Sequence, residues 1–232
     1  MPSENPPDSA PTVLVGQPGP SAINTIDCLV GSYKDTHVEC GNRGGQAHHI
    51  IPDEYFRKVE YNRIAGHAAA AAAAASGKPD ASRVDDSFPT IEDGCCICVG
   101  GNAYGSTAQE SDPQSPEGKA NKAAILQKGA DHAKAGGTDL TTSRGHGFLH
   151  QIDERFRERP EPTVDNALQD ANDLLNELVE YENPPDADCV AVAKECIKNQ
   201  MAAAKKKGAK LNKKAPRSEE SKAKRLEKLG LP

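Results

Sequence analysis

Four of the seven histidines in this chain occur as two close pairs. His48 and His49 are adjacent, and His146 and His150 lie four residues apart in a second stretch. Residues at i and i+4 share one face of an α-helix, about one turn apart, so His146 and His150 are spaced to bind one metal ion. The first pair would then supply a third ligand and a base. We therefore expect a metal site built from two distant parts of the chain.

The first pair lies between a glycine-rich loop and a proline. We expect residues 47–51 to form the end of a strand that Pro52 terminates, because proline cannot donate to a β-ladder. Adjacent strand residues point to opposite faces, so His48 and His49 should not bind the same ion. A second strand is expected in a stretch rich in β-branched and cysteine residues. Helices are expected where apolar residues recur at helical spacing or where alanine is abundant. The expected strand covers residues 88–99, and the expected helices cover residues 53–75, 119–135, 145–157, 163–181 and 187–204.

The composition favours one domain of ordinary size with extra segments. Residues 1–20 contain six prolines and should form a flexible leader. We assign residues 21–182 to the domain that carries the histidines, and residues 183–232 to a C-terminal helix and a basic tail. The hydrophobic fraction is only 36%, aromatic residues make up 4%, and tryptophan is absent, so the core should be modest.

Charge is distributed unevenly along the chain. The net charge is −6, yet residues 205–228 contain eleven Lys or Arg and three Glu, which gives this segment +8 and the rest −14. An acidic protein is a poor match for nucleic acid unless a local patch or a bound metal attracts the phosphates. The basic run could track phosphates or could be a solvated tail. Its first lysines are the candidates for nucleic-acid binding: Lys205, Lys206, Lys207 and Lys210.

The state of the seven cysteines is inferred from the expected compartment. The first residues lack the cationic start and apolar run of a secretory signal, and no stretch of 18 apolar residues predicts insertion into a membrane. We therefore expect synthesis and folding in a reducing cytoplasm, where cysteines remain thiols. Cys95, Cys96 and Cys98 are close enough to suggest a zinc-thiolate site, but they lack a matching second pair, which favours buried free thiols.

The segment Ala47-His48-His49-Ile50-Ile51-Pro52, followed by the distant His146-x-x-x-His150, resembles the HNH or His-Me finger (ββα-metal) nuclease superfamily. It is most similar to HH-type nuclease domains of bacterial polymorphic toxins, including type VI secretion effectors. The similarity covers roughly residues 41–157. It implies an α+β fold in which a ββα-metal core with a short two-stranded hairpin is embedded in a mainly helical domain.

The resemblance also implies a role for each matching residue. His48, His146 and His150 would bind the metal, and His49 would be the general base that activates water. Asn102 is the candidate for the family's middle asparagine, which holds the loop that bears the base. From its position beside the second pair, and not from the resemblance, Arg144 could clamp a phosphate bidentately, or could instead cap a helix or face water.

This residue set suits phosphodiester hydrolysis. A neutral histidine is a base near physiological pH, and a three-histidine divalent site with open positions supplies a Lewis acid. Histidine ligands favour Zn²⁺ or Ni²⁺, while Mg²⁺ or Mn²⁺ can also serve in turnover. The resemblance implies an antibacterial toxin that cuts DNA, or alternatively RNA, with a cognate immunity protein and a secretion apparatus or adaptor that exports it into a target cell. The rival hypothesis is a non-catalytic zinc-binding interaction module whose histidines and cysteines are structural.

Overall fold

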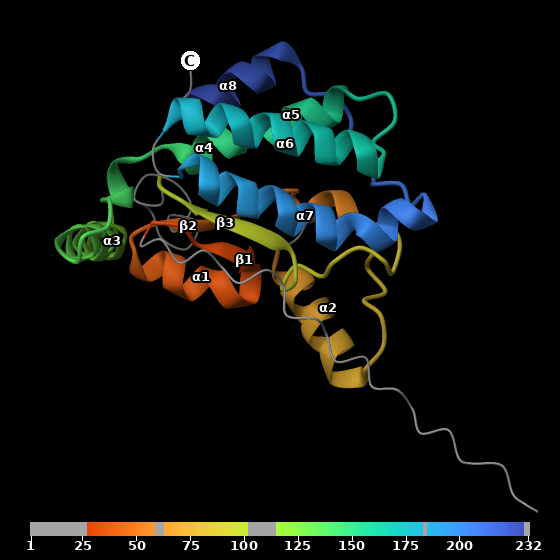
Figure 1. Cartoon of the computed structure of the whole chain (residues 1–232), viewed down its shortest axis with the longest axis horizontal. Coiled ribbons are helices and arrows are strands. Elements are labelled where there is room, and N and C mark those ends of the chain that lie inside the picture. Colours follow the sequence, from red (N-terminus) through yellow and green to blue (C-terminus); the bar gives the residue numbers. More distant parts are fainter. Residues whose placement is uncertain (1–26, 59–62, 102–114, 183–184, 230–232) are drawn as a thin grey trace, which may run out of the picture.

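A small antiparallel sheet lies at the centre of the molecule, between helices (Figure 1). The computed structural model describes residues 27–58, 63–101, 115–182 and 185–229. Strands β1 (Val30–Ser32) and β2 (Gln46–His49) both pair with β3 (Cys95–Val99), which gives the order β1-β3-β2. The α+β class with mainly helical content is confirmed. The two-stranded hairpin is wrong, because the sheet has a third strand and residues 50–94 separate β2 from β3.

Every residue of the central strand β3 is buried, and its alternation defines two cores. Cys95, Ile97 and Val99 belong to the larger core, whereas Cys96 and Cys98 belong to a smaller one on the other face. The register of β2 carries this alternation to the histidines. His48 lies opposite Ile97 and therefore faces the larger core, while His49 lies opposite Cys96 and faces the smaller one.

Helices cover both faces of the sheet (Figure 1). Helix α1 (Tyr33–Asn42) packs on the face of the smaller core, and α7 (Ala187–Lys207) packs on the opposite face. Helix α6 (Val164–Tyr181) packs against α7, and the short helices α4 (Gly145–Leu149) and α5 (Gln151–Glu158) pack against α6. The helix expected over residues 163–181 is present as α6, and its Leu174, Leu175 and Leu178 are buried. Helix α1 was not predicted from the sequence.

Other predicted elements are present with different limits. Residues 53–75 form one 3₁₀ turn (Asp53–Phe56) and then helix α2 (Arg63–Ser76), with residues 59–62 outside the described part. The expected strand 88–99 is confined to its last five residues. The expected helix 119–135 is α3 (Pro116–Lys134), and a 3₁₀ turn (Leu140–Thr142) precedes α4. The basic tail ends in helix α8 (Glu219–Leu229), which lies beside α5 in Figure 1.

Six of the seven cysteines form disulfides, so the expectation of free thiols is wrong. The bonds are Cys28–Cys189, Cys40–Cys98 and Cys95–Cys196, and the seventh cysteine, Cys96, is a buried thiol outside these disulfides. Two of the bonds join α7 to the sheet side of the fold, and the third joins α1 to β3. Partners 58 to 161 residues apart meet only in the folded chain, which is why spacing along the sequence did not reveal them.

The boundary expected at residue 182 does not separate two cores. Val190, Ile197 and Met201 of α7 and Leu211 beyond it belong to the same buried cluster as the sheet and α6. The leader expected over residues 1–20 lies outside the described residues. Among the described helices, none is both long enough and apolar enough to cross a bilayer.

Candidate metal centre

Three histidine rings converge on one point between β2 and the α4–α5 junction. The ligand atoms available on His48, His146 and His150 all lie within 4.8 Å of one another. The ring centroids are 4.7 to 5.0 Å apart, and each pair of rings meets edge to face, at 70° to 88°. Three imidazoles in this arrangement can point their nitrogens at a shared ion, with room left for water or substrate.

The helix that carries the second pair is interrupted at His150 without losing the spacing. His150 is the C-cap of α4 and also the N-cap of α5. Its backbone keeps a right-handed helical conformation (φ −64°, ψ −12°). The i,i+4 relation to His146 is therefore preserved. The expected single helix over residues 145–157 is wrong, but its consequence for the two rings holds.

Glycine at position 100 allows α4 to reach the end of β3. The backbone N–H of His146 donates to the carbonyl oxygen of Gly100 over 2.9 Å. A Cβ atom on Gly100 would lie 2.1 Å from the carbonyl oxygen of Leu140, which is far too close for any other residue type. This close approach sets the distance between His146 and the strand that carries His48.

The three histidines fit a divalent ion. His48 is buried, and its Nδ1 atom has no partner in hydrogen-bond geometry among the described residues. Burial lowers the pKa of His48 well below its usual value, and burial followed by the charge of Arg225 lowers the pKa of His150 to about 4. Both rings are thus neutral at physiological pH, which is the form that binds metal. A buried ring nitrogen without a partner is costly, and ligation to an ion would satisfy it.

His49 lies beside these rings but belongs to a different set of contacts. It is stacked on Tyr33 of α1 at 5.1 Å, and its Nε2 is 2.8 Å from the carbonyl oxygen of Ile91. A carbonyl oxygen can only accept, so Nε2 carries the proton and the lone pair of the neutral ring is on Nδ1. The backbone of residue 91 thus fixes the tautomer of His49, as the second partner of a histidine often does.

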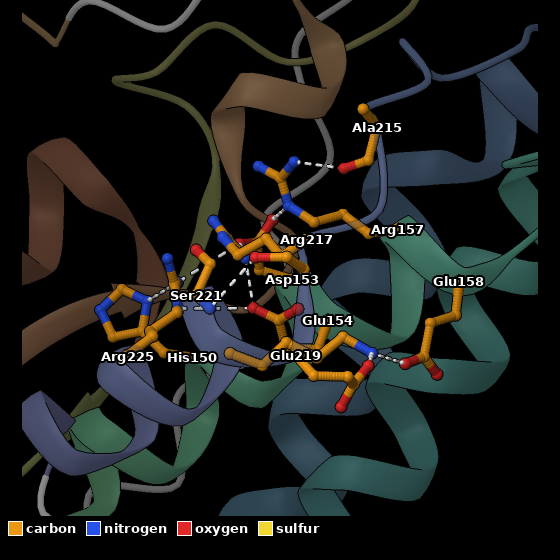
Figure 2. A network of polar contacts seen from close by, with 12 residues as sticks. His150, Asp153, Glu154, Arg157, Glu158, Ala215, Arg217, Glu219, Ser221 and Arg225 are labelled. Carbon is orange, nitrogen blue, oxygen red and sulfur yellow. Dashed lines mark hydrogen bonds and ion pairs between the residues drawn. The ribbon is translucent and has the colours of Figure 1, made fainter.

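A charged network borders the centre on the side of α5 and α8 (Figure 2). The buried carboxylate of Asp153 accepts from the Tyr55 hydroxyl and from Arg157 Nε at 3.1 Å, and pairs with Arg217 at 2.5 Å and Arg225 at 3.3 Å. Burial alone would raise the pKa of Asp153, but the hydrogen bonds from Tyr55 and Arg217 and the neighbouring arginines lower it. Asp153 is therefore an ionised anchor for these arginines.

A pocket of about 400 Å³ is lined by the four histidines and by members of the charged network. It gives the three converging histidines and His49 a common solvent-accessible space, flanked by cationic and anionic side chains. The charged and aromatic residues at its border are Tyr33, Asp53, Glu54, Asp153, Arg217 and Arg225.

The other predicted site residues are not brought to this pocket. Asn102 lies outside the described residues, so its expected role stays a prediction. Arg144 is exposed at the N-cap of α4 and does not line the pocket. The four lysines do not line it either. Three of them pair with carboxylates elsewhere: Lys205 with Asp165, Lys207 with Asp85 and Asp86, and Lys210 with Glu161.

Three residues at the centre were not predicted from the sequence: Ile91, Arg217 and Arg225. The contribution of Ile91 is a backbone carbonyl, which no side-chain pattern can reveal. The two arginines were counted only as part of a basic run, and their position depends on how α8 and the residues just before it pack. Arg217 lies just before α8 and Arg225 lies within it, so no helical spacing in the sequence could have indicated that they meet.

Comparison of the chain with protein-family models, with curated proteins and with solved structures found no match.

Proposed function

We propose that this chain is a metal-dependent endonuclease that hydrolyses phosphodiester bonds of DNA, or alternatively RNA, without strong sequence specificity. The observation that carries the proposal is the convergence of His48, His146 and His150 from two distant segments, with their ligand atoms within 4.8 Å. His49 lies on the adjacent position of the same strand and opens into the same pocket.

The arrangement of elements supports a ββα-metal core. In the proposed assignment, β2 and β3 are its two strands and the α4–α5 segment is its helical part. β2 carries the first histidine pair and is paired with β3. The first turn of α4 contacts the end of β3, because the His146 N–H donates to the carbonyl oxygen of Gly100. The third strand and the remaining helices would be additions to this core.

The three histidines would hold one divalent ion, Mg²⁺, Zn²⁺, Ni²⁺ or Mn²⁺. When bound, such an ion supplies Lewis-acid stabilisation of the charge that develops on the phosphate and on the leaving oxygen. His49 would accept the proton of the attacking water at Nδ1, because its Nε2–H is committed to the Ile91 carbonyl. Arg217 and Arg225, which border the same pocket, offer positive charge for the phosphate.

The proposal extends to an antibacterial toxin, on the basis of the sequence resemblance. A cell that makes a non-specific nuclease needs protection, so we propose a cognate immunity protein and a secretion apparatus or adaptor that delivers the chain into a target cell. The three disulfides support export after synthesis in the bacterial cytoplasm, because such bonds form and persist in oxidising compartments.

The second candidate is a structural zinc module without catalysis. Its mixed histidine and cysteine version loses its support, because Cys95 and Cys98 are in disulfides. A version with histidines alone would need a fourth ligand to close the site, whereas the three rings border a pocket. A chelator would unfold a structural module and would leave a catalytic domain folded.

The decisive test is cleavage of supercoiled plasmid and of total RNA by purified, oxidised protein with each metal. We expect metal-dependent nicking that EDTA stops, that His48→Ala and His150→Ala abolish, and that His49→Ala strongly reduces. His132→Gln is the matched control, since His132 is bonded to Asp27 away from the pocket and glutamine can keep that hydrogen bond. Intact nucleic acid with every metal would refute the proposal.

A further inference from the structure

The C-terminal helix contacts one of the three converging histidines. Nη2 of Arg225, in α8, lies 3.4 Å from Nδ1 of His150, at hydrogen-bond distance (Figure 2). Arg225 belongs to residues 183–232, which were expected to lie outside the domain that carries the histidines. The contact therefore links the basic tail to the metal centre.

This contact uses the electron pair that a metal ion would need. A guanidinium only donates hydrogen bonds, so the Nδ1 atom of His150 must be the acceptor. A neutral imidazole has a single basic nitrogen lone pair, and its other nitrogen carries hydrogen. When Nδ1 accepts from Arg225, Nε2 is protonated and cannot ligate, and ligation through Nδ1 would need the same lone pair. The Arg225–His150 hydrogen bond and metal ligation by neutral His150 are therefore mutually exclusive.

The position of Arg225 also opposes a cation electrostatically. Its guanidinium is held beside the centre by Asp153 at 3.3 Å and by Glu154 at 3.7 Å, both on α5. A second tether is Lys222, which pairs with Glu158 at 2.8 Å. Among the α8 side chains that the structure describes, none is buried. The contacts described between α8 and α5 are ion pairs, which can rearrange without disturbing the buried residues of the core.

We propose that Arg225 is a positioning residue that competes with the metal ion for His150, so that metal loading requires Arg225 to leave this ring. The inference rests on the histidine site of the proposed function, but it does not require that the protein cleave nucleic acid. By linkage, an ion that displaces Arg225 also loosens α8, and release of α8 tightens metal binding by the same factor.

The test is the affinity of the full-length, oxidised protein for Zn²⁺ and Co²⁺, by calorimetry and by the visible absorption of Co²⁺. Apparent affinity is reduced by the fraction of molecules in which His150 is available, so Arg225→Met should bind the metal about tenfold more tightly or better. A residue that merely supported the site would give the opposite sign. Unchanged or weaker binding by Arg225→Met would overturn the proposal.

Arg217→Met is the matched control. Arg217 pairs with the same two carboxylates, Asp153 and Glu154, and its charge also acts on His150, but no hydrogen bond between Arg217 and this ring is described. Loss of Arg217 changes the local charge to the same extent as loss of Arg225. A similar gain in metal affinity for Arg217→Met would mean that the removed charge alone explains the effect, and it would also overturn the proposal. In a His150→Ala background, Arg225 and the metal ion have no histidine ring to compete for at this position. Adding Arg225→Met there should leave the remaining metal affinity unchanged. Tightening in that background would likewise contradict the proposal.

Hydrogen exchange gives a second readout that is independent of activity. Adding Zn²⁺ to the wild-type protein should speed amide exchange in residues 219–229 and slow it in residues 146–150. Slower or unchanged exchange in α8 would contradict displacement of Arg225. Cleavage without this coupling would remove only the present inference, and coupling without cleavage would remove only the nuclease proposal.

Discussion

At the scale of single residues, the two adjacent histidines are separated by the alternation of one strand. His48 turns toward α4 and α5 and meets two other imidazoles, while His49 turns toward α1 and is oriented by a backbone carbonyl. This division is what a catalytic assignment needs, because one ring must be a ligand and the other must act as a base. It also makes the two functions separable by mutation.

We predict that His49→Ala lowers the single-turnover cleavage rate by about 10²–10⁴-fold, the usual contribution of a general base. Because His49 is not among the three converging rings, the dissociation constant for Zn²⁺ should change little. Plasmid nicking and calorimetry on the same preparation measure both quantities. A variant that loses metal and activity together would show that His49 is a ligand instead.

A substitution at Gly94 offers a second test of the role of the His49 ring. A Cβ atom at this position would lie 2.5 Å from Cδ2 of His49, so Gly94→Ala should displace the imidazole and reduce cleavage while metal affinity is kept. Gly41→Ala is the control, since a Cβ atom there meets nothing within 4 Å. Equal activity of the two variants, measured by plasmid nicking, would contradict the assigned position of His49.

The lowered pKa of His150, to about 4, predicts how the stability of the metal-free protein depends on pH. The folded state favours the neutral ring, so the unfolded chain binds the proton first as the pH falls below about 6.5. Stability contributed by the neutral ring is therefore complete above that pH and is lost as the pH falls toward 4, by roughly 3 kcal/mol in total. Urea unfolding between pH 7 and 4 should show a steeper loss for wild type than for His150→Gln. Parallel profiles would contradict the assigned shift.

At the scale of elements, the disulfides attach α7 to the rest of the fold. Cys95–Cys196 and Cys28–Cys189 connect this helix to β3 and to the residues just before β1. We predict that the double substitution Cys95→Ala and Cys196→Ala costs about 2–5 kcal/mol of unfolding free energy, since a bridge that closes a long loop restricts the unfolded chain. Urea denaturation without reductant measures this, and the difference from wild type should shrink when dithiothreitol is added to both proteins.

Local signals predicted some elements well and others poorly. Helix α6 formed where apolar spacing predicted it, with Leu174, Leu175 and Leu178 buried, and the Thr163 side chain caps it by accepting from the Asn166 amide. The i,i+4 spacing of His146 and His150 predicted that their rings meet, although the helix breaks between α4 and α5. Helix α1 has little amphipathic character and contains Gly41, so its formation depends on packing against the sheet and not on a local pattern.

At the scale of the whole molecule, the candidate site could be predicted only in part from the sequence. The four histidines were identified from type and spacing. The cysteines were misinterpreted because the argument rested on the expected compartment, whereas pairing depends on which distant segments pack together. Arg225 could not be identified, because its role follows from α8 lying on α5 beside His150.

We predict that the fold survives removal of metal. The larger core and the three disulfides do not involve the histidine rings, so EDTA should change the far-ultraviolet circular dichroism little and lower the melting temperature by only a few degrees. Adding dithiothreitol should lower it much further. Unfolding by EDTA alone would favour the structural zinc module over the catalytic site.

The buried thiol of Cys96 has a practical consequence for anyone who handles the protein. It stands between Cys95 and Cys98, each half of a different bridge, and seven cysteines allow about 105 ways to form three bonds and leave one sulfur over. Refolding from denaturant under air would therefore trap scrambled isomers, and a storage buffer with mercaptoethanol would yield a covalently different molecule. Samples for assay need a glutathione shuffling step and a mass-spectrometric check of the bridges.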